Sequence, residues 1–153
     1  MNGGRYPTGY PAWKTGTLVT DRVVRQPEKM RMVIDEGQYI NMQQAIKNGE
    51  NPAQKLGGWA TKEPVNSVAD MRSKLAVTEE FKPTIKEGKA NKFYVVEFEV
   101  QPGVGIREGK AGSMYEYTTK QTLPGNAQQM NFVDKSPYTN PELFKISLIK
   151  EIK

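Results

Sequence analysis

Arginines and glutamines lie beside glycine-, tryptophan- and proline-rich stretches in a chain of 153 residues that contains no histidine and no cysteine. Metal sites built on His or Cys, cysteine nucleophiles, Ser-His triads and paired-histidine ribonuclease chemistry are therefore excluded. The remaining chemistry is that of a protein that binds an anionic substrate, orients it and stabilises developing charge. Guanidinium and amide groups suit this task because they hold anions in fixed geometry.

Two arginines are candidates for binding the anion. Arg22 ends the strand-like stretch GTLVTDR, where its planar fork could hold a phosphate, or where it could simply pair with Asp21 at the surface. Arg72 falls four residues after Val68 and beside Met71, at the border of a predicted buried helix face. There its aliphatic stem could cover the core equally well.

Two loop-and-strand stretches supply further candidates. GGWAT, residues 57–61, joins two glycines to Trp59 and Thr61, which could form the wall of a ligand site or bury the indole in the core. LPGNAQQMNF turns at its Pro-Gly pair and then places Gln128 and Gln129 on opposite faces of a strand. One of these amides must point inward, where it needs either a structural network or a substrate.

The length predicts one domain that can bury a core without disulfides or a structural metal. We expect an irregular N-terminal segment over 1–15 and the folded domain over 16–153. The net charge of +5 is compatible with a nucleotide or nucleic acid ligand. No apolar run approaches the ~20 residues of a membrane span, and the N-terminus lacks the apolar stretch of a signal peptide. We therefore expect a soluble chain without a targeting signal of its own.

The periodicity predicts an α+β fold with strands in the majority. Strand patterns occur at 17–25, 29–34, 59–61, 92–100, 104–107, 114–118, 128–133 and 144–152. Helix patterns occur at 41–47 and 67–77, the second with a capping box of Ser67 and Asp70, and a helical turn opens at Asn140-Pro141. The stretch 92–100 is apolar enough on both faces to predict the central strand of a mixed, mostly antiparallel sheet.

In their order along the chain, these stretches resemble the C-terminal domains of bacterial polymorphic toxins typified by the tuberculosis necrotizing toxin. That family hydrolyses NAD and is related in architecture to ADP-ribosyltransferase toxins. GTLVTDR resembles its Gly-Thr strand with an Asp-Arg end, and MRSKLAV its helix with the second arginine. PGNAQQ resembles its proline-glycine loop ending in a functional glutamine. The similarity runs roughly from Gly16 to the end of the chain.

The resemblance implies a secreted antibacterial toxin domain with an ADP-ribosyltransferase-like fold, which hydrolyses NAD at the nicotinamide ribosyl bond or transfers ADP-ribose. The implied catalytic residues are Arg22, Arg72 and Gln129, and the implied substrate-binding residues are Trp59, Thr61, Gly125 and Phe132. NAD would be the substrate, with no cofactor and no metal. A larger protein would deliver the domain, as in contact-dependent growth inhibition, to act in the cytoplasm of the target cell, and an acidic immunity protein would neutralise it in the producer.

Two departures from the family pattern leave alternatives open. The loop before the glutamine is less rich in glycine, and the stretch between Arg22 and Gly57 is longer than expected, so that Arg25 or Arg31 could take the place of Arg22. Glu97 and Glu99, which share a face of the central strand, could supply the carboxylate that transferases use, or form a solvated face.

Two other functions remain open at this point. A ribonuclease toxin could cleave tRNA without histidine, using Arg, Lys and Thr side chains. The residues that would grip the RNA are Lys82, Lys86, Lys89, Lys92 and Arg107. A noncatalytic binding module is the other alternative, if the polar groups named above serve only structure or solvation.

Overall fold

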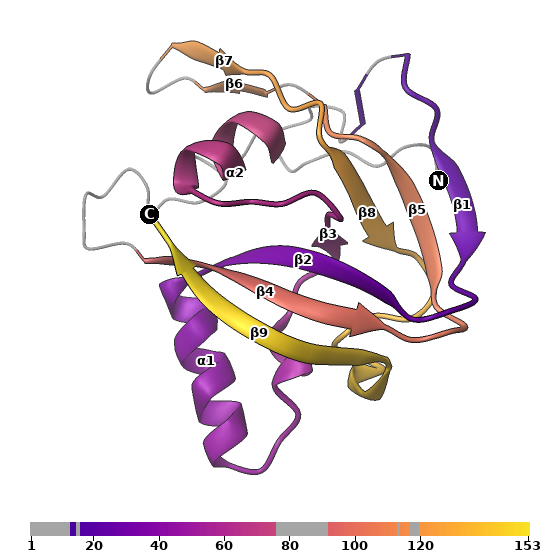
Figure 1. Ribbon diagram of the computed structural model, residues 1–153, viewed down its shortest axis with the longest axis vertical. Helices are drawn as coiled ribbons and strands as arrows, with labels where there is room; N and C mark the ends of the chain where they lie inside the picture. The colour runs from indigo at the N-terminus through magenta and orange to yellow at the C-terminus, as the bar shows by residue number, and fades with distance from the viewer. Residues whose placement is uncertain (1–12, 15, 76–91, 113, 117–119) are drawn as a thin grey trace.

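The computed structural model describes residues 13, 14, 16–75, 92–112, 114–116 and 120–153. Within these residues, the strands form a four-stranded sheet, a three-stranded sheet and a two-stranded hairpin, and two α-helices pack against them (Figure 1). Every strand pair in the described part of the chain is antiparallel. The predicted α+β class is confirmed, but the strands divide between two main sheets and do not form one mixed sheet.

The three-stranded sheet consists of β2 (Glu28–Asp35), β4 (Phe93–Val100) and β9 (Phe144–Ile152), with β4 in the centre. The prediction that this strand is central is confirmed. Its alternate side chains are buried on both faces: Val96 belongs to the main core, and Val95 to a smaller apolar cluster. Enclosure on both sides explains why the stretch is continuously apolar over its first half.

The four-stranded sheet carries most of the residues singled out in the sequence. Its strands, in spatial order, are β1 (Thr20–Val23), β5 (Gly105–Lys110), β8 (Gln128–Phe132) and β3 (Trp59–Ala60). The residue after β3 joins the two main sheets, because Thr61 and Arg31 of β2 exchange both backbone hydrogen bonds at 2.7 and 2.8 Å. The sheets therefore meet at β3 and β2.

Helix α1 (Glu36–Lys47) is longer than the predicted helix over 41–47. It begins at a capping box, in which the Asp35 carboxylate accepts from the Gln38 backbone N–H at 2.8 Å and the Gln38 side chain accepts from the Asp35 N–H at 3.2 Å. The sequence contains this Asp-x-x-Gln signal, but the prediction did not use it. Met42 of α1 is fully buried in the main core.

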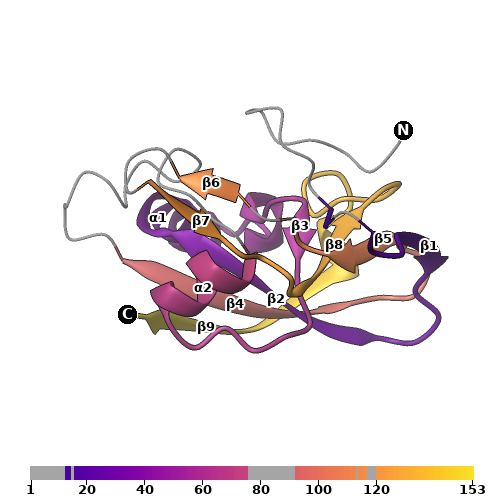
Figure 2. The same cartoon turned by 90° about the horizontal axis from the view of Figure 1, so that it is seen from above.

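Helix α2 (Val68–Leu75) lies over the face of the three-stranded sheet that carries Val95, opposite the face that carries Val96 (Figures 1 and 2). There Met71 joins the smaller apolar cluster. The predicted capping box is half formed. The Ser67 hydroxyl accepts from the Asp70 N–H at 3.0 Å, whereas the Asp70 carboxylate accepts from the N–H of Asn66 and not from that of Ser67. One reciprocal bond is therefore shifted by one residue.

Short elements complete the described fold. These are the 3-10 helices η1 (Pro52–Lys55) and η2 (Pro141–Leu143), and the hairpin strands β6 (Met114–Glu116) and β7 (Gln121–Leu123). The predicted helical turn and the strand from residue 114 are both present. Strand β7 was not predicted, because three residues are too short to show an alternating pattern. The predicted parts at 76–77 and 117–118 lie outside the described residues.

Trp13, from the predicted irregular segment 1–15, packs into the fold. Its backbone bridges to Ala111, its side chain is buried, and its ring lies 5.3 Å from that of Trp59, centroid to centroid. A side chain on Gly109 would meet the Trp13 ring at 3.1 Å, so the absence of one allows this close approach. The described end of the segment is thus part of the domain's packing.

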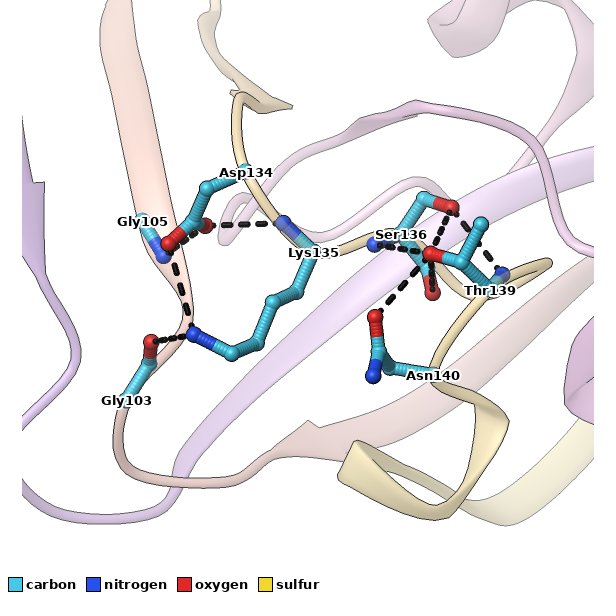
Figure 3. A network of polar contacts seen from close by, with 7 residues as sticks. All are labelled: Gly103, Gly105, Asp134, Lys135, Ser136, Thr139 and Asn140. Atoms are coloured by element: carbon cyan, nitrogen blue, oxygen red, sulfur yellow. Dashed lines mark hydrogen bonds and ion pairs between the residues drawn. The ribbon is translucent and has the colours of Figure 1, made fainter.

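A polar network ties the turn between β4 and β5 to the chain that leaves β8 (Figure 3). The Asp134 carboxylate accepts from the backbone N–H groups of Gly105 and Lys135 at 2.6 and 2.8 Å, and the Lys135 ammonium donates to the Gly103 carbonyl at 3.0 Å. The hydrogen bond from Gly105 is the main cause that lowers the pKa of Asp134. The network fixes the start of β5 against the end of β8.

Candidate active site

A polar cleft of about 950 Å³ opens where β5 and β8 meet the chain that leads into β1. Its described lining is Lys14, Gly16, Thr17, Leu18, Thr20, Glu63, Glu108, Gly109, Lys110, Asn126 and Gln128. Gln128 lies opposite Lys110 in the ladder and Glu108 opposite Met130, so all four share one face of the sheet. That face is apolar at one end, in the main core, and polar at the other, in the cleft.

Glu108 is the most firmly held group in this cleft. One carboxylate oxygen accepts from Arg22 Nε at 2.7 Å and the other accepts from Gln128 Nε2 at 2.8 Å. Only 18% of the side chain is exposed. With a charged donor on one side and an amide on the other, the carboxylate is fixed in orientation.

Arg22 connects Glu108 to a second carboxylate. Its two terminal nitrogens donate to the two oxygens of Glu28 at 2.5 and 2.7 Å, and the Lys62 ammonium also pairs with Glu28. The bonds from Arg22 lower the pKa of Glu28 to about 2, and the bonds to Glu28 and then Glu108 raise the pKa of Arg22. The Arg22 guanidinium, which was predicted to hold phosphate, is thus hydrogen-bonded to two carboxylates. It is not among the described residues that line the cleft.

Two residues that follow β3, Thr61 and Glu63, hold the backbone of Gln128. Its N–H donates to the carboxylate of Glu63, and its carbonyl accepts from the Thr61 hydroxyl at 2.5 Å. The same hydroxyl accepts from the N–H of Glu63 at 3.0 Å. Thr61 is only 1% exposed, so it positions Gln128 and Glu63 and does not offer its hydroxyl to a ligand. Its predicted role in substrate binding is therefore indirect.

The glutamines take opposite faces, as strand alternation predicts, and the buried one is Gln129. It lies opposite Gly109 in the ladder, on the face that the Trp13 ring covers, and is 4% exposed. Gln128 is the amide that lines the cleft. The structure therefore separates Gln129, the predicted catalytic residue, from Arg22 and Glu108 by the thickness of the sheet.

Arg72 lies on α2, half-buried with its Nε enclosed. The next residue, Ser73, accepts from the N–H of Gly125 at 2.7 Å, which joins α2 to the loop before β8. Gly125 has φ +68°, and a side chain there would approach the Gly112 carbonyl to 2.5 Å. The loop itself therefore requires glycine at position 125. Neither Gly125 nor Arg72 is among the described residues that line the cleft.

The two predicted aromatic ligand walls lie in packed surroundings. Phe132 is 8% exposed and packs in the main core, with ring centroids 4.9 Å from Phe144 and 6.3 Å from Phe98. Trp59 is half-buried against Trp13. Neither ring lines the cleft, because strand register turns Phe132 into the core and Trp59 to the face opposite Glu108.

The alternative residues are also engaged or exposed. Arg25 is exposed, whereas Arg31 donates to Glu97 at 3.3 Å and to the Lys62 carbonyl at 2.7 Å. Glu99 is exposed on the three-stranded sheet. None of these lines the cleft in the described structure, so neither the replacement of Arg22 nor a carboxylate from this strand gains support.

Of the predicted RNA-gripping residues, Lys92 is exposed and Arg107 is bound by Asp21 through two hydrogen bonds of 2.8 and 2.9 Å. Lys82, Lys86 and Lys89 lie outside the described residues. Sequence reasoning missed Glu63, Glu108 and Gln128 as cleft residues. The alternation of IREGK, residues 106–110, places Glu108 and Lys110 on one face of a strand. Only the register of β5 with β8 shows that Gln128 is the partner of Glu108.

The chain is similar to the solved structure of Tne2 in complex with Tni2. The TM-score is 0.65 and the sequence identity 26%, with 93% of this chain and 100% of that chain covered. No protein-family model and no curated protein matches the chain. In the described part of the chain, no helix is long and apolar enough to cross a membrane.

Proposed function

We propose that this chain is the toxin domain of an interbacterial toxin and that it hydrolyses NAD at the bond between nicotinamide and ribose. The likeness to Tne2, a toxin solved with its immunity protein Tni2, supports the toxin role. The resemblance of the sequence motifs to NAD-hydrolysing toxins supports the substrate. An ADP-ribosyltransferase-like architecture, delivery by a larger protein and action in the cytoplasm of the target cell belong to the same proposal.

The observation that carries the chemistry is the carboxylate of Glu108, held by Arg22 and Gln128 in the cleft. Breaking the nicotinamide ribosyl bond produces an oxocarbenium-like centre, as in glycoside hydrolysis. A carboxylate that is already oriented stabilises that positive charge without reorganising. Nicotinamide is a good leaving group, so neither histidine nor cysteine is needed.

Each neighbour of Glu108 has a distinct role in this proposal. The Gln128 amide donates through Nε2 to Glu108, which leaves its Oε1 to accept from a ribose hydroxyl or from the attacking water. Arg22 is a positioning residue, since it donates to Glu108 and Glu28 and is not among the described residues that line the cleft. Gln128 thus takes the role that the family resemblance assigns to Gln129.

The test is release of nicotinamide from NAD, measured by chromatography for the wild type and for Glu108→Gln. We expect the variant to lose about 10² to 10³ in turnover, the scale for one preorganised group in an active site. Glu99→Gln, an exposed acid on the other sheet, is the matched control and should stay within a few-fold. No nicotinamide release by the folded wild type, or full turnover by Glu108→Gln, would refute the proposed chemistry.

A parallel incubation with total tRNA addresses the ribonuclease alternative. We expect intact tRNA, since Arg107 is bound by Asp21. Cleavage of tRNA together with no release of nicotinamide from NAD would instead favour the ribonuclease function. Mass spectrometry of the products then shows whether ADP-ribose goes to water or to a protein.

A further inference from the structure

The cations that surround the cleft fall into two groups. Arg22 is compensated by the carboxylates of Glu108 and Glu28. Lys14 and Lys110 line the cleft, but neither forms an ion pair with a carboxylate among the described residues. The positive charge that the cleft offers to a ligand therefore comes from these lysines and not from the arginine.

The lysines start from adjoining backbone positions, because the Lys14 N–H donates to the Lys110 carbonyl at 2.8 Å. Both lysines line the same cleft, so an anion bound there would be attracted by both ammonium charges. The Lys14 ammonium donates to Oδ1 of Asn126 at 2.7 Å, which leaves Nδ2 of that amide as a further donor. Asn126 adopts φ +77°, which brings its side chain to the cleft from the loop before β8.

We propose that Lys14, Lys110 and Asn126 form a subsite for a diphosphate group, and that this is the diphosphate of the dinucleotide cleaved beside Glu108. The identity of the dinucleotide rests on the proposed function. Glu108 and Lys110 are two residues apart on one face of β5, roughly 7 Å at the usual rise of a strand. That spacing is comparable with one ribose and its 5′ phosphate. The cleft thus presents a carboxylate to the ribosyl cation and two ammonium groups to the diphosphate.

The assignment extends the functional domain beyond the boundary expected from sequence. Lys14 belongs to the segment 1–15, which was predicted to be irregular, and its neighbour Trp13 anchors it by packing against Trp59. The segment therefore contributes a ligand-binding side chain as well as packing.

The experiment titrates inorganic pyrophosphate into the full chain by calorimetry. Lys14→Gln and Lys110→Gln should each weaken binding about 10-fold, and the double variant about 100-fold, the range for charge-assisted hydrogen bonds. Lys47→Gln, an exposed lysine at the end of α1, is the matched control and should bind like the wild type. Melting temperatures check that each variant is folded, and wild-type binding should weaken with salt.

Steady-state kinetics supply a second readout. With NAD, the double variant should raise KM by a similar factor and leave kcat within a few-fold, because the lysines bind ground state and transition state alike. With nicotinamide riboside, which lacks the diphosphate, the double variant should match the wild type. An unchanged KM for NAD in an active double variant would overturn the subsite and leave the proposed function intact.

The converse outcome separates the two proposals in the other direction. Pyrophosphate binding that depends on both lysines, in a wild type that does not cleave NAD, would support the subsite and refute the hydrolase. If the lysine variants bind pyrophosphate normally but lose affinity for a short single-stranded RNA, the diphosphate assignment is overturned in favour of a polynucleotide.

Discussion

Gln128 and Gln129 are adjacent, of the same type and on opposite faces of β8, which makes them internal controls for one another. Gln128 donates to Glu108 in the cleft, whereas Gln129 is buried on the face that the Trp13 ring covers. At the scale of the residue, a place in the cleft and burial on the opposite face of the sheet thus belong to different amides.

We expect Gln128→Ala to lose about 10² to 10³ in NAD turnover, because the acceptor beside Glu108 is removed. We expect Gln129→Ala to destabilise the fold by about 1 to 3 kcal/mol, since buried groups lose a hydrogen-bond partner, and to keep its turnover per folded molecule. NAD turnover and melting temperature measured on both variants check this. The reverse pattern, with turnover lost only in Gln129→Ala at unchanged melting temperature, would restore the assignment implied by the family resemblance.

At the scale of the elements, the contacts of Arg22 matter as much for assembly as for the cleft. Arg22 on β1 and Glu28 on β2 join strands of the two main sheets, and Glu108 on β5 extends the contact across the ladder. Three elements are therefore held at one guanidinium. Loss of the charge on either carboxylate weakens the joint between the sheets.

Acid should therefore weaken this joint in a defined range of pH. Glu28 has its pKa lowered to about 2 in the folded protein, from an ordinary value near 4.5. Its contribution to stability is complete above the higher value and is lost as the pH falls towards the lower one. Urea midpoints measured across this range should fall with acid in the wild type, and Glu28→Gln should flatten that part of the profile. Glu142→Gln, an exposed acid, serves as control, and an identical slope in Glu28→Gln and the wild type would contradict the assignment.

Elements with a long local pattern were predicted correctly from the sequence. The arrangement of the strands into sheets was not, because it depends on which strands pair. The strand predicted over 92–100, observed as β4, was recognisable because both of its faces are apolar, and β9 because it is long. The division into two sheets was not predicted, since it depends on β4 pairing with β2 and β9 while β5 pairs with β1 and β8. Such pairings join segments far apart in the chain and leave no local periodicity.

At the scale of the whole molecule, the net charge of +5 and the lysine-bordered cleft favour an acidic partner. Leu18, which is 79% exposed and lines that cleft, offers such a partner an apolar surface. Tne2 is likewise solved in complex with Tni2. We propose that an immunity protein pairs with this domain and neutralises it in the cell that produces it.

We predict that expression of the chain alone in the bacterial cytoplasm arrests growth, and that coexpression of a tight acidic partner encoded nearby restores it. Growth curves measure the arrest, and copurification measures the complex. Glu108→Gln should be expressed without harm and still bind the partner, which separates catalysis from recognition. Harmless expression of the folded wild type at high level would remove most of the support for a toxin.

Composition and local periodicity alone determined which classes of catalysis are excluded and which neighbouring side chains lie on opposite faces of a strand. The absence of histidine and cysteine excluded whole classes of catalysis, and strand alternation required Gln128 and Gln129 to face opposite ways. Covalent geometry imposes that alternation in any strand, so it can be read without a fold. The same geometry cannot say which face becomes a cleft.

Tertiary structure alone decided which glutamine meets the solvent and which carboxylate it contacts. The register of β8 against β5 brings Gln128 to Glu108, and the Trp13 ring closes the other face over Gly109. Lys14 reaches the same cleft only because its backbone bonds to Lys110, almost a hundred residues away. The physical reason is that alternation assigns side chains to two faces, whereas burial and solvation depend on what packs against each face, and distant segments supply that packing.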